Sequence, residues 1–124
     1  EPGAADRAGP VGQLKRALAG RACTRSVPIW VTETGVGGAR SGDERNTSKR
    51  ELRRGCRILN ALLRRWYRDK RVDAAFQYTY REDTVFPVGL ADAGLTQVYP
   101  TYGLWREWGS RVPDAPAPEQ PCPG

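Results

Sequence analysis

The sequence predicts an α/β fold in which two parallel strands are covered by helices. Helix-like and strand-like segments alternate along the 124 residues. The first strand-like segment is almost continuously apolar, which is typical of a parallel strand covered by helices. The connection between the two strands contains a helix, which favours a parallel pairing. Two such strands leave two open edges and cannot bury both sheet faces, so we expect a fragment of a larger parallel sheet or barrel.

The chain begins with a segment that has little secondary-structure signal. Residues 1–10 read EPGAADRAGP and indicate a loose leader. Residues 11–22 then place Val11, Leu14 and Leu18 at helical spacing, which predicts a short amphipathic helix.

The first strand is predicted over residues 27–34, which read VPIWVTET. Its β-branched and aromatic residues favour a strand. Strict alternation of side chains would place Val31 and Glu33 on one face. A polar, glycine-rich loop follows over residues 35–46, but it lacks the spacing of a nucleotide-binding fingerprint.

A long amphipathic helix is predicted from Ser48 to about Asp69. Ser48 and Glu51 form the pattern of a capping box at its start. The helix carries one apolar stripe, which consists of Leu52, Cys56, Leu59, Leu62, Leu63 and Trp66.

The second strand is predicted within residues 72–83, where apolar and polar residues alternate. A last helix begins at Pro100, since proline is tolerated in a first helical turn, and it runs to about residue 109. The proline-rich residues 110–124 are expected to form a disordered tail.

The chain is basic, with 20 Lys and Arg against 14 Asp and Glu. Ten of the 20 basic residues lie between Lys49 and Arg71. No aromatic residues interleave with these arginines as a stacking surface requires, so nucleic acid is disfavoured as a partner. No apolar run reaches the 18 residues that suggest a membrane span.

The chain has no histidine and three cysteines without a CxxC pair, which disfavours a zinc site and histidine-based nucleophilic chemistry. We expect no cofactor. Cys23 and Cys56 fall on helices that flank the same strand. They are therefore expected either to form a disulfide or to be two buried thiols, with Cys122 left over.

Four segments in order resemble one family: WVTETG (30–35), VDAAFQYTYRED (72–83), FPVGL (86–90) and YPTYGLWREW (99–108). Together they resemble the C-terminal end of a clan A glycoside hydrolase, of the cellulase-type, family 5-like members found in actinobacteria. The resemblance covers residues 11–109. It implies a partial (β/α)₈ TIM barrel, whose seventh and eighth strands lie in this chain.

The resemblance also implies site residues. Glu33 would be the nucleophile of a retaining O-glycosyl hydrolase that acts on a polysaccharide or glycoside. The family's acid/base residue belongs to an Asn-Glu pair, which this chain lacks. Tyr78 or Tyr80 would stack on the sugar, and Asp83 would help shape the cleft.

Such a chain would carry the nucleophile without its partner and would be inactive alone. Its partners would be a carbohydrate and the N-terminal part of the barrel, in a secreted bacterial protein. Each of these expectations has an alternative that the sequence leaves open. Glu33 would be a solvated carboxylate at a strand end, and the two tyrosines would be core residues. The chain as a whole would be a non-catalytic basic module that binds polyanions or a partner chain.

Overall fold

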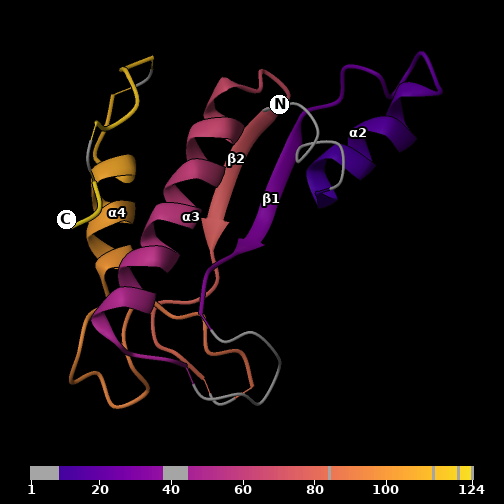
Figure 1. The fold of residues 1–124 in the computed structure, drawn as a ribbon. Helices are drawn as coiled ribbons and strands as arrows, with labels where there is room; N and C mark the ends of the chain where they lie inside the picture. The colour runs from indigo at the N-terminus through magenta and orange to yellow at the C-terminus, as the bar shows by residue number, and fades with distance from the viewer. Residues whose placement is uncertain (1–8, 38–44, 84, 113, 120, 124) are drawn as a thin grey trace.

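The computed structural model describes residues 9–37, 45–83, 85–112, 114–119 and 121–123. The predicted order of helix, strand, helix, strand, helix is confirmed (Figure 1). Residues 1–8 of the expected leader and 38–44 of the glycine-rich loop lie outside the described residues. The elements are α2 (Pro10–Ala19), β1 (Ile29–Thr34), α3 (Lys49–Arg68), β2 (Val72–Gln77) and α4 (Pro100–Gly109).

Strands β1 and β2 pair in parallel, as predicted. In the part of the chain that the structure describes, no third strand joins this sheet. Helix α3 lies between β2 and α4, and α2 lies beyond β1 (Figure 1). Helix α3 contacts both β2 and α4, and β2 pairs with β1, so these four elements form one packed unit.

The start of α3 is fixed by only half of the predicted capping box. The backbone N–H of Glu51 donates to the Ser48 hydroxyl at 3.4 Å, which satisfies one free donor of the first turn. In a complete capping box the Glu51 side chain would accept a hydrogen bond from the Ser48 N–H. Here the Ser48 N–H donates to the Asn46 side chain instead, at 3.0 Å. The Glu51 carboxylate instead pairs with Arg54 at 3.3 Å.

The core forms where the apolar stripe of α3 meets α4. Cys56, Leu59, Leu63 and Leu104 are at most 5% exposed and pack as one cluster. Full burial of such a side chain stabilises the fold by about 1.5–3 kcal/mol. Partly buried residues from β2, α3, α4 and the tail complete this cluster, among them Trp66, Ala75, Trp105, Trp108 and Cys122.

The C-terminal tail packs against α3, which differs from the disordered tail that we expected. The Tyr67 hydroxyl donates to the carbonyl of Ala115 at 2.5 Å. Arg64 donates to the carbonyls of Pro118 and Glu119. Proline prevents a helix or a sheet ladder, but it leaves carbonyl groups that side chains of a neighbouring helix can bind.

The cysteine pairing differs from the predicted one. Cys56 is bonded to Cys122 in the tail, with a Cα–Cα distance of 5.9 Å, and Cys23 is free and exposed. The predicted Cys23–Cys56 bond is therefore wrong, and so is the alternative of two buried thiols. The physical reason is that the Cys56 face of α3 packs on α4 and the tail, whereas Cys23 lies in the turns after α2.

Replacing Gly89 by alanine should destabilise the protein by about 1–3 kcal/mol, because the new methyl group overpacks the loop after β2. A Cβ at this position would lie 2.4 Å from the backbone nitrogen of Glu82 and 2.6 Å from its Cα. The matched control is Gly103→Ala in α4, where the new Cβ would meet nothing within 4 Å beyond its chain neighbours and the backbone of its own helix. That change should stabilise the helix by about 0.5–1 kcal/mol. Urea denaturation followed by circular dichroism measures both, and equal effects would contradict the prediction.

Candidate functional site

The candidate site lies where β1 and β2 end. Parallel strands present their carboxyl ends at one edge of a sheet, where α/β proteins place their ligands. The backbone N–H of Tyr78 donates to the carbonyl of Thr34 at 2.8 Å, so the pairing continues just past β2. A hollow of about 370 Å³ opens at this edge. Its wall consists of Glu33, Thr34, Gly35, Tyr78, Phe86 and Val88.

Glu33 does not share a face with Val31, as strict alternation predicted. Val31 pairs with Ala75 and Thr34 pairs with Gln77, so three steps on β1 match two on β2. Such an irregularity is a bulge, and it reverses the alternation beyond it. Ala75 packs on the core and Gln77 accepts a hydrogen bond from a tryptophan of α4 at 2.7 Å. Val31 and Thr34 therefore face the helices, and Glu33, which adjoins Thr34, faces the opposite side.

In the part of the chain that the structure describes, the face of the sheet opposite α3 and α4 is aromatic and exposed. The rings of Trp30 and Phe76 lie 6.0 Å apart and are 59% and 47% exposed. The indole N–H of Trp30 donates to Asp73 at 3.1 Å. Glu33 therefore extends from a surface of exposed rings rather than from a polar one.

Asp83 organises the loop that faces Glu33. Its Oδ1 accepts hydrogen bonds from the backbone N–H groups of Val85 and Phe86, at 2.8 and 2.6 Å. The hydroxyl of Tyr78 donates to Oδ2 at 3.3 Å, and the Phe86 ring meets the Tyr78 ring edge to face. The peptide bond that follows Tyr78 is cis.

These contacts shift the pKa values of Asp83 and Tyr78 in opposite directions. The hydrogen bond from Phe86, with those from Val85 and Tyr78, holds the pKa of Asp83 below its usual value. The negative charge of Asp83 raises the pKa of Tyr78, and Glu33 adds a smaller effect of the same sign. At neutral pH the site therefore presents an Asp83 carboxylate and a neutral Tyr78 hydroxyl.

The structure brings together three of the four residues that the resemblance placed in the site. Glu33 and Tyr78 line the hollow, and Asp83 is bonded to Tyr78. Tyr80 does not line it, because its ring contacts Tyr102 of α4 at 6.1 Å. Of the two tyrosines proposed for stacking, only Tyr78 is at the hollow.

A buried cluster around Arg45 supports this edge of the sheet, and sequence reasoning missed it. The Arg45 guanidinium lies 3.5 Å from the Glu82 carboxylate and 4.0 Å from the centre of the Tyr99 ring. It also donates to the carbonyl of Gly89 at 2.8 Å and to that of Val36. Tyr99 donates to the other oxygen of Glu82 at 2.8 Å. One side chain thus ties the loop after β1 to the loop after β2 and to the start of α4.

The sequence has no local signal for this cluster. Arg45 and Glu82 are 37 residues apart, and arginine is frequent along the chain. Only their burial distinguishes Arg45 and Glu82 from the exposed charged residues of the chain, since their side chains are 6% and 9% exposed.

Burial and the hydrogen bond to Glu82 raise the pKa of Tyr99 to about 12. Tyrosine in an unfolded chain ionises near pH 10. The stabilisation that this shift represents is therefore complete below pH 10 and is lost as pH rises toward 12. Ultraviolet titration should show one tyrosine that ionises about two units late, and Tyr99→Phe should remove that step. A step that persists in Tyr99→Phe would assign the late ionisation to another residue.

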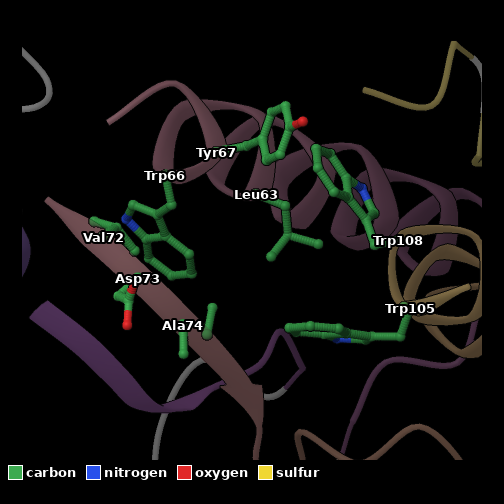
Figure 2. Close-up of a pocket in the computed structure, with 10 residues that line it drawn as sticks. Leu63, Trp66, Tyr67, Val72, Asp73, Ala74, Trp105 and Trp108 are labelled. Carbon is green, nitrogen blue, oxygen red and sulfur yellow. The ribbon is translucent and has the colours of Figure 1, made fainter. Parts of the chain in front are cut away.

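A second hollow, of about 240 Å³, lies at the other end of the sheet between α3, β2 and α4. Trp66, Trp105 and Trp108 surround it, together with Leu63 (Figure 2). It reaches Val72, the first residue of β2, so it is far along the strands from Glu33. Its wall is mostly apolar, with Asp73 as its one carboxylate, which suits packing rather than acid–base chemistry.

Comparisons with models of protein families, with curated proteins and with solved structures each find no match to the chain. Among the residues that the structure describes, no three carboxylate, cysteine or histidine side chains gather in a way that could hold a metal ion. No helix within that part of the chain is long and apolar enough to cross a membrane.

Proposed function

We propose that this chain forms the seventh and eighth strands of a (β/α)₈ barrel that belongs to a retaining glycoside hydrolase. The observation that carries the proposal is the gathering of Glu33, Tyr78 and Asp83 at the carboxyl ends of two adjacent parallel strands. Barrel enzymes of this kind place their catalytic residues at that edge.

In this proposal Glu33 is the nucleophile. Its carboxylate attacks the anomeric carbon and forms an ester, while the bond to the leaving oxygen breaks and that oxygen takes a proton from an acid. Water then hydrolyses the ester, and the former acid, now a base, accepts a proton from the water. Glu33 is exposed on the uncovered face of the sheet, where a substrate can approach it.

Neither carboxylate that follows β2 suits the role of the acid. Glu82 is buried against Arg45 and Tyr99, so it is held in place and out of reach of the hollow. Asp83 has a lowered pKa and is therefore a poor proton donor at neutral pH. We propose that the acid/base residue comes from the part of the barrel outside this chain.

The ring that would bind the sugar is Tyr78, with Phe86 beside it. Apolar faces of sugars stack on aromatic rings, and a tyrosine adds a hydroxyl for polar contacts. The hydrogen bond to Asp83 fixes the orientation of that hydroxyl.

Two further features support a larger barrel in an oxidising compartment. The aromatic face of the two-stranded sheet is uncovered, and further strands of a barrel would enclose it. The Cys56–Cys122 disulfide favours a secreted protein, because such bonds persist outside the reducing cytosol.

Labelling with a mechanism-based fluorosugar tests this proposal in a protein that contains the whole barrel. We expect the label on Glu33, identified by peptide mass spectrometry, and no label in Glu33→Gln. Asp83→Asn is the matched control, because it removes a nearby carboxylate that is not the nucleophile and should still be labelled. A label on any other residue of this chain would overturn the assignment.

A further inference from the structure

The hollow of about 240 Å³ between α3, β2 and α4 has no role in the proposed glycosidase. It shares no residue with the hollow at Glu33, so whatever occupies it is independent of that proposal. Three of the four tryptophans of the chain lie on its wall, together with Tyr67 and Leu63 (Figure 2). They are Trp66, Trp105 and Trp108, and we call this feature the indole hollow.

Two rings of the indole hollow are anchored by hydrogen bonds to residues outside it. The indole N–H of Trp105 donates to Gln77 of β2 at 2.7 Å. The indole N–H of Trp108 donates to Asn60 of α3 at 3.1 Å. Neither acceptor lies on the wall of the hollow. The two bonds therefore fix rings of α4 relative to β2 and α3 and leave the indole N–H groups unavailable to a ligand.

Arg111 provides a third anchor. Its guanidinium lies 4.6 Å from the centre of the Tyr67 ring and 5.1 Å from that of the Trp108 ring, and it is not part of the wall. The two rings meet edge to face, with their centres 5.6 Å apart. Because a cation already lies against these rings, a second cation in the hollow is disfavoured.

The interior of the indole hollow also lacks a facing carboxylate. Asp73 lies on the wall, but its carboxylate accepts a hydrogen bond from the indole of Trp30 on β1 at 3.1 Å and points toward that strand (Figure 2). Among the described residues, no acceptor is bonded to the indole N–H of Trp66, whose nitrogen lies beside Val72 (Figure 2). The hollow therefore offers one donor at its edge and ring surfaces elsewhere, which suits a neutral ligand.

The anchors explain why the fold leaves this hollow open. Protein interiors are close-packed, because an apolar gap deprives its wall of van der Waals contacts. The rings of Trp105 and Trp108 cannot move into the gap without breaking their bonds to Gln77 and Asn60. Water that enters meets surfaces with few hydrogen-bonding groups, so an apolar ligand that displaces it is favoured. The indole hollow is thus preformed and mostly apolar, as small-molecule sites are.

We propose that the indole hollow binds a neutral aromatic molecule of one ring or two fused rings. An apolar cavity of about 150 Å³ holds benzene in another protein, so a hollow of about 240 Å³ suits a ring system of this size. Aromatic rings attract one another in tilted or offset arrangements, and the wall offers rings from both α3 and α4 to such a ligand.

Calorimetric titration of the 124-residue chain with toluene tests the site. The variant Gly109→Leu enlarges a residue of the wall, where the new Cβ would meet nothing within 4 Å beyond its chain neighbours and the backbone of its own helix. The added side chain should occupy the hollow and weaken toluene binding about tenfold, which corresponds to about 1.4 kcal/mol. The matched control is Gly103→Leu, an equally unobstructed glycine of α4 outside the hollow, which should change the affinity less than about twofold.

Two further measurements keep the proposal open to refutation. If Gly109→Leu does not fold by circular dichroism, Trp66→Leu removes one ring of the wall and should weaken toluene binding about threefold. Titration with cellobiose tests a sugar, whose apolar face also stacks on aromatic rings. Binding of cellobiose but not toluene, lost in Gly109→Leu, would assign the hollow to a sugar and overturn the proposal. Equal losses of toluene affinity in both leucine variants, or no toluene binding by the wild type, would also overturn it.

Discussion

Replacing Arg45 by methionine should lower the free energy of unfolding by about 3–5 kcal/mol, the usual cost of leaving one partner of a buried ion pair uncompensated. Glu82 would remain 7% exposed with only the hydroxyl of Tyr99 to stabilise its charge. The carbonyls of Gly89 and Val36 would lose their donor as well. Methionine fills a similar volume, so the loss reports on charge and hydrogen bonding rather than on a cavity.

The matched control for this change is Arg54→Met on α3. Arg54 also pairs with a glutamate, Glu51, but its side chain is 66% exposed. Exposed pairs of this kind contribute about 0–1 kcal/mol, so the control should lose less than about 1 kcal/mol. Urea denaturation gives both values. Equal losses would show that Arg45 is not held as the structure describes.

A second variant keeps the prediction testable if Arg45→Met does not fold. Arg45→Lys preserves the charge but removes the planar fork that reaches Glu82 and the two carbonyls at once. It should lie between the wild type and Arg45→Met in stability. The double variant Arg45→Met/Glu82→Gln should regain part of the loss, because the uncompensated charge is then absent.

The helices were predictable because their signals are local. Ser48 caps α3, the apolar stripe from Leu52 gives its buried face, and Pro100 begins α4, so each signal lies within the element that it defines. The end of the second strand was less predictable. We expected a strand within residues 72–83, but β2 ends at Gln77, after which the chain pairs with residues 90 and 91 instead. That exchange depends on the loop between residues 82 and 90, which folds back on the chain just after β2.

The features that sequence reasoning missed are all non-local. The Cys56–Cys122 bond spans 66 residues, and it depends on which face of α3 meets the tail. The pairing of Arg45 with Glu82 spans 37 residues. Neither follows from spacing or composition, because both depend on how α3 packs against α4 and on the loops around it.

The candidate site combines residues that a local sequence signal identifies with features that the sequence does not reveal. A carboxylate at the end of a strand singled out Glu33, and the resemblance added Tyr78 and Asp83. Alternation alone then placed Glu33 on the same face as Val31, because the bulge in β1 cannot be recognised from the sequence of six residues. The sequence likewise left Tyr78 and Tyr80 as alternatives, and the structure places Tyr78 at the hollow and the ring of Tyr80 beside Tyr102.

Replacing Cys122 by serine should destabilise the protein by about 4 kcal/mol. A disulfide limits the conformations of the unfolded chain, and the loop entropy for a separation of 66 residues corresponds to about 4 kcal/mol. The matched control is Cys23→Ser. That thiol is free and exposed, so its replacement should change stability by less than about 0.5 kcal/mol.

The same substitution should release the tail from α3. The hydrogen bonds from Arg64 and Tyr67 to tail carbonyls contribute about 0.5–1.5 kcal/mol each. Ordering each residue of the tail costs about 1–2 kcal/mol in backbone entropy. These bonds alone cannot hold the tail, so trypsin should cleave after Arg111 faster in Cys122→Ser than in the wild type or in Cys23→Ser.

Reduction of the wild type provides an independent test of the same bond. Dithiothreitol should lower the stability of the wild type to that of Cys122→Ser and should leave Cys122→Ser unchanged. If Cys122→Ser matched Cys23→Ser in both stability and cleavage rate, the covalent bond would not be what holds the tail. The packing of the prolines against α3 and α4 would then have to account for the order of residues 114–119.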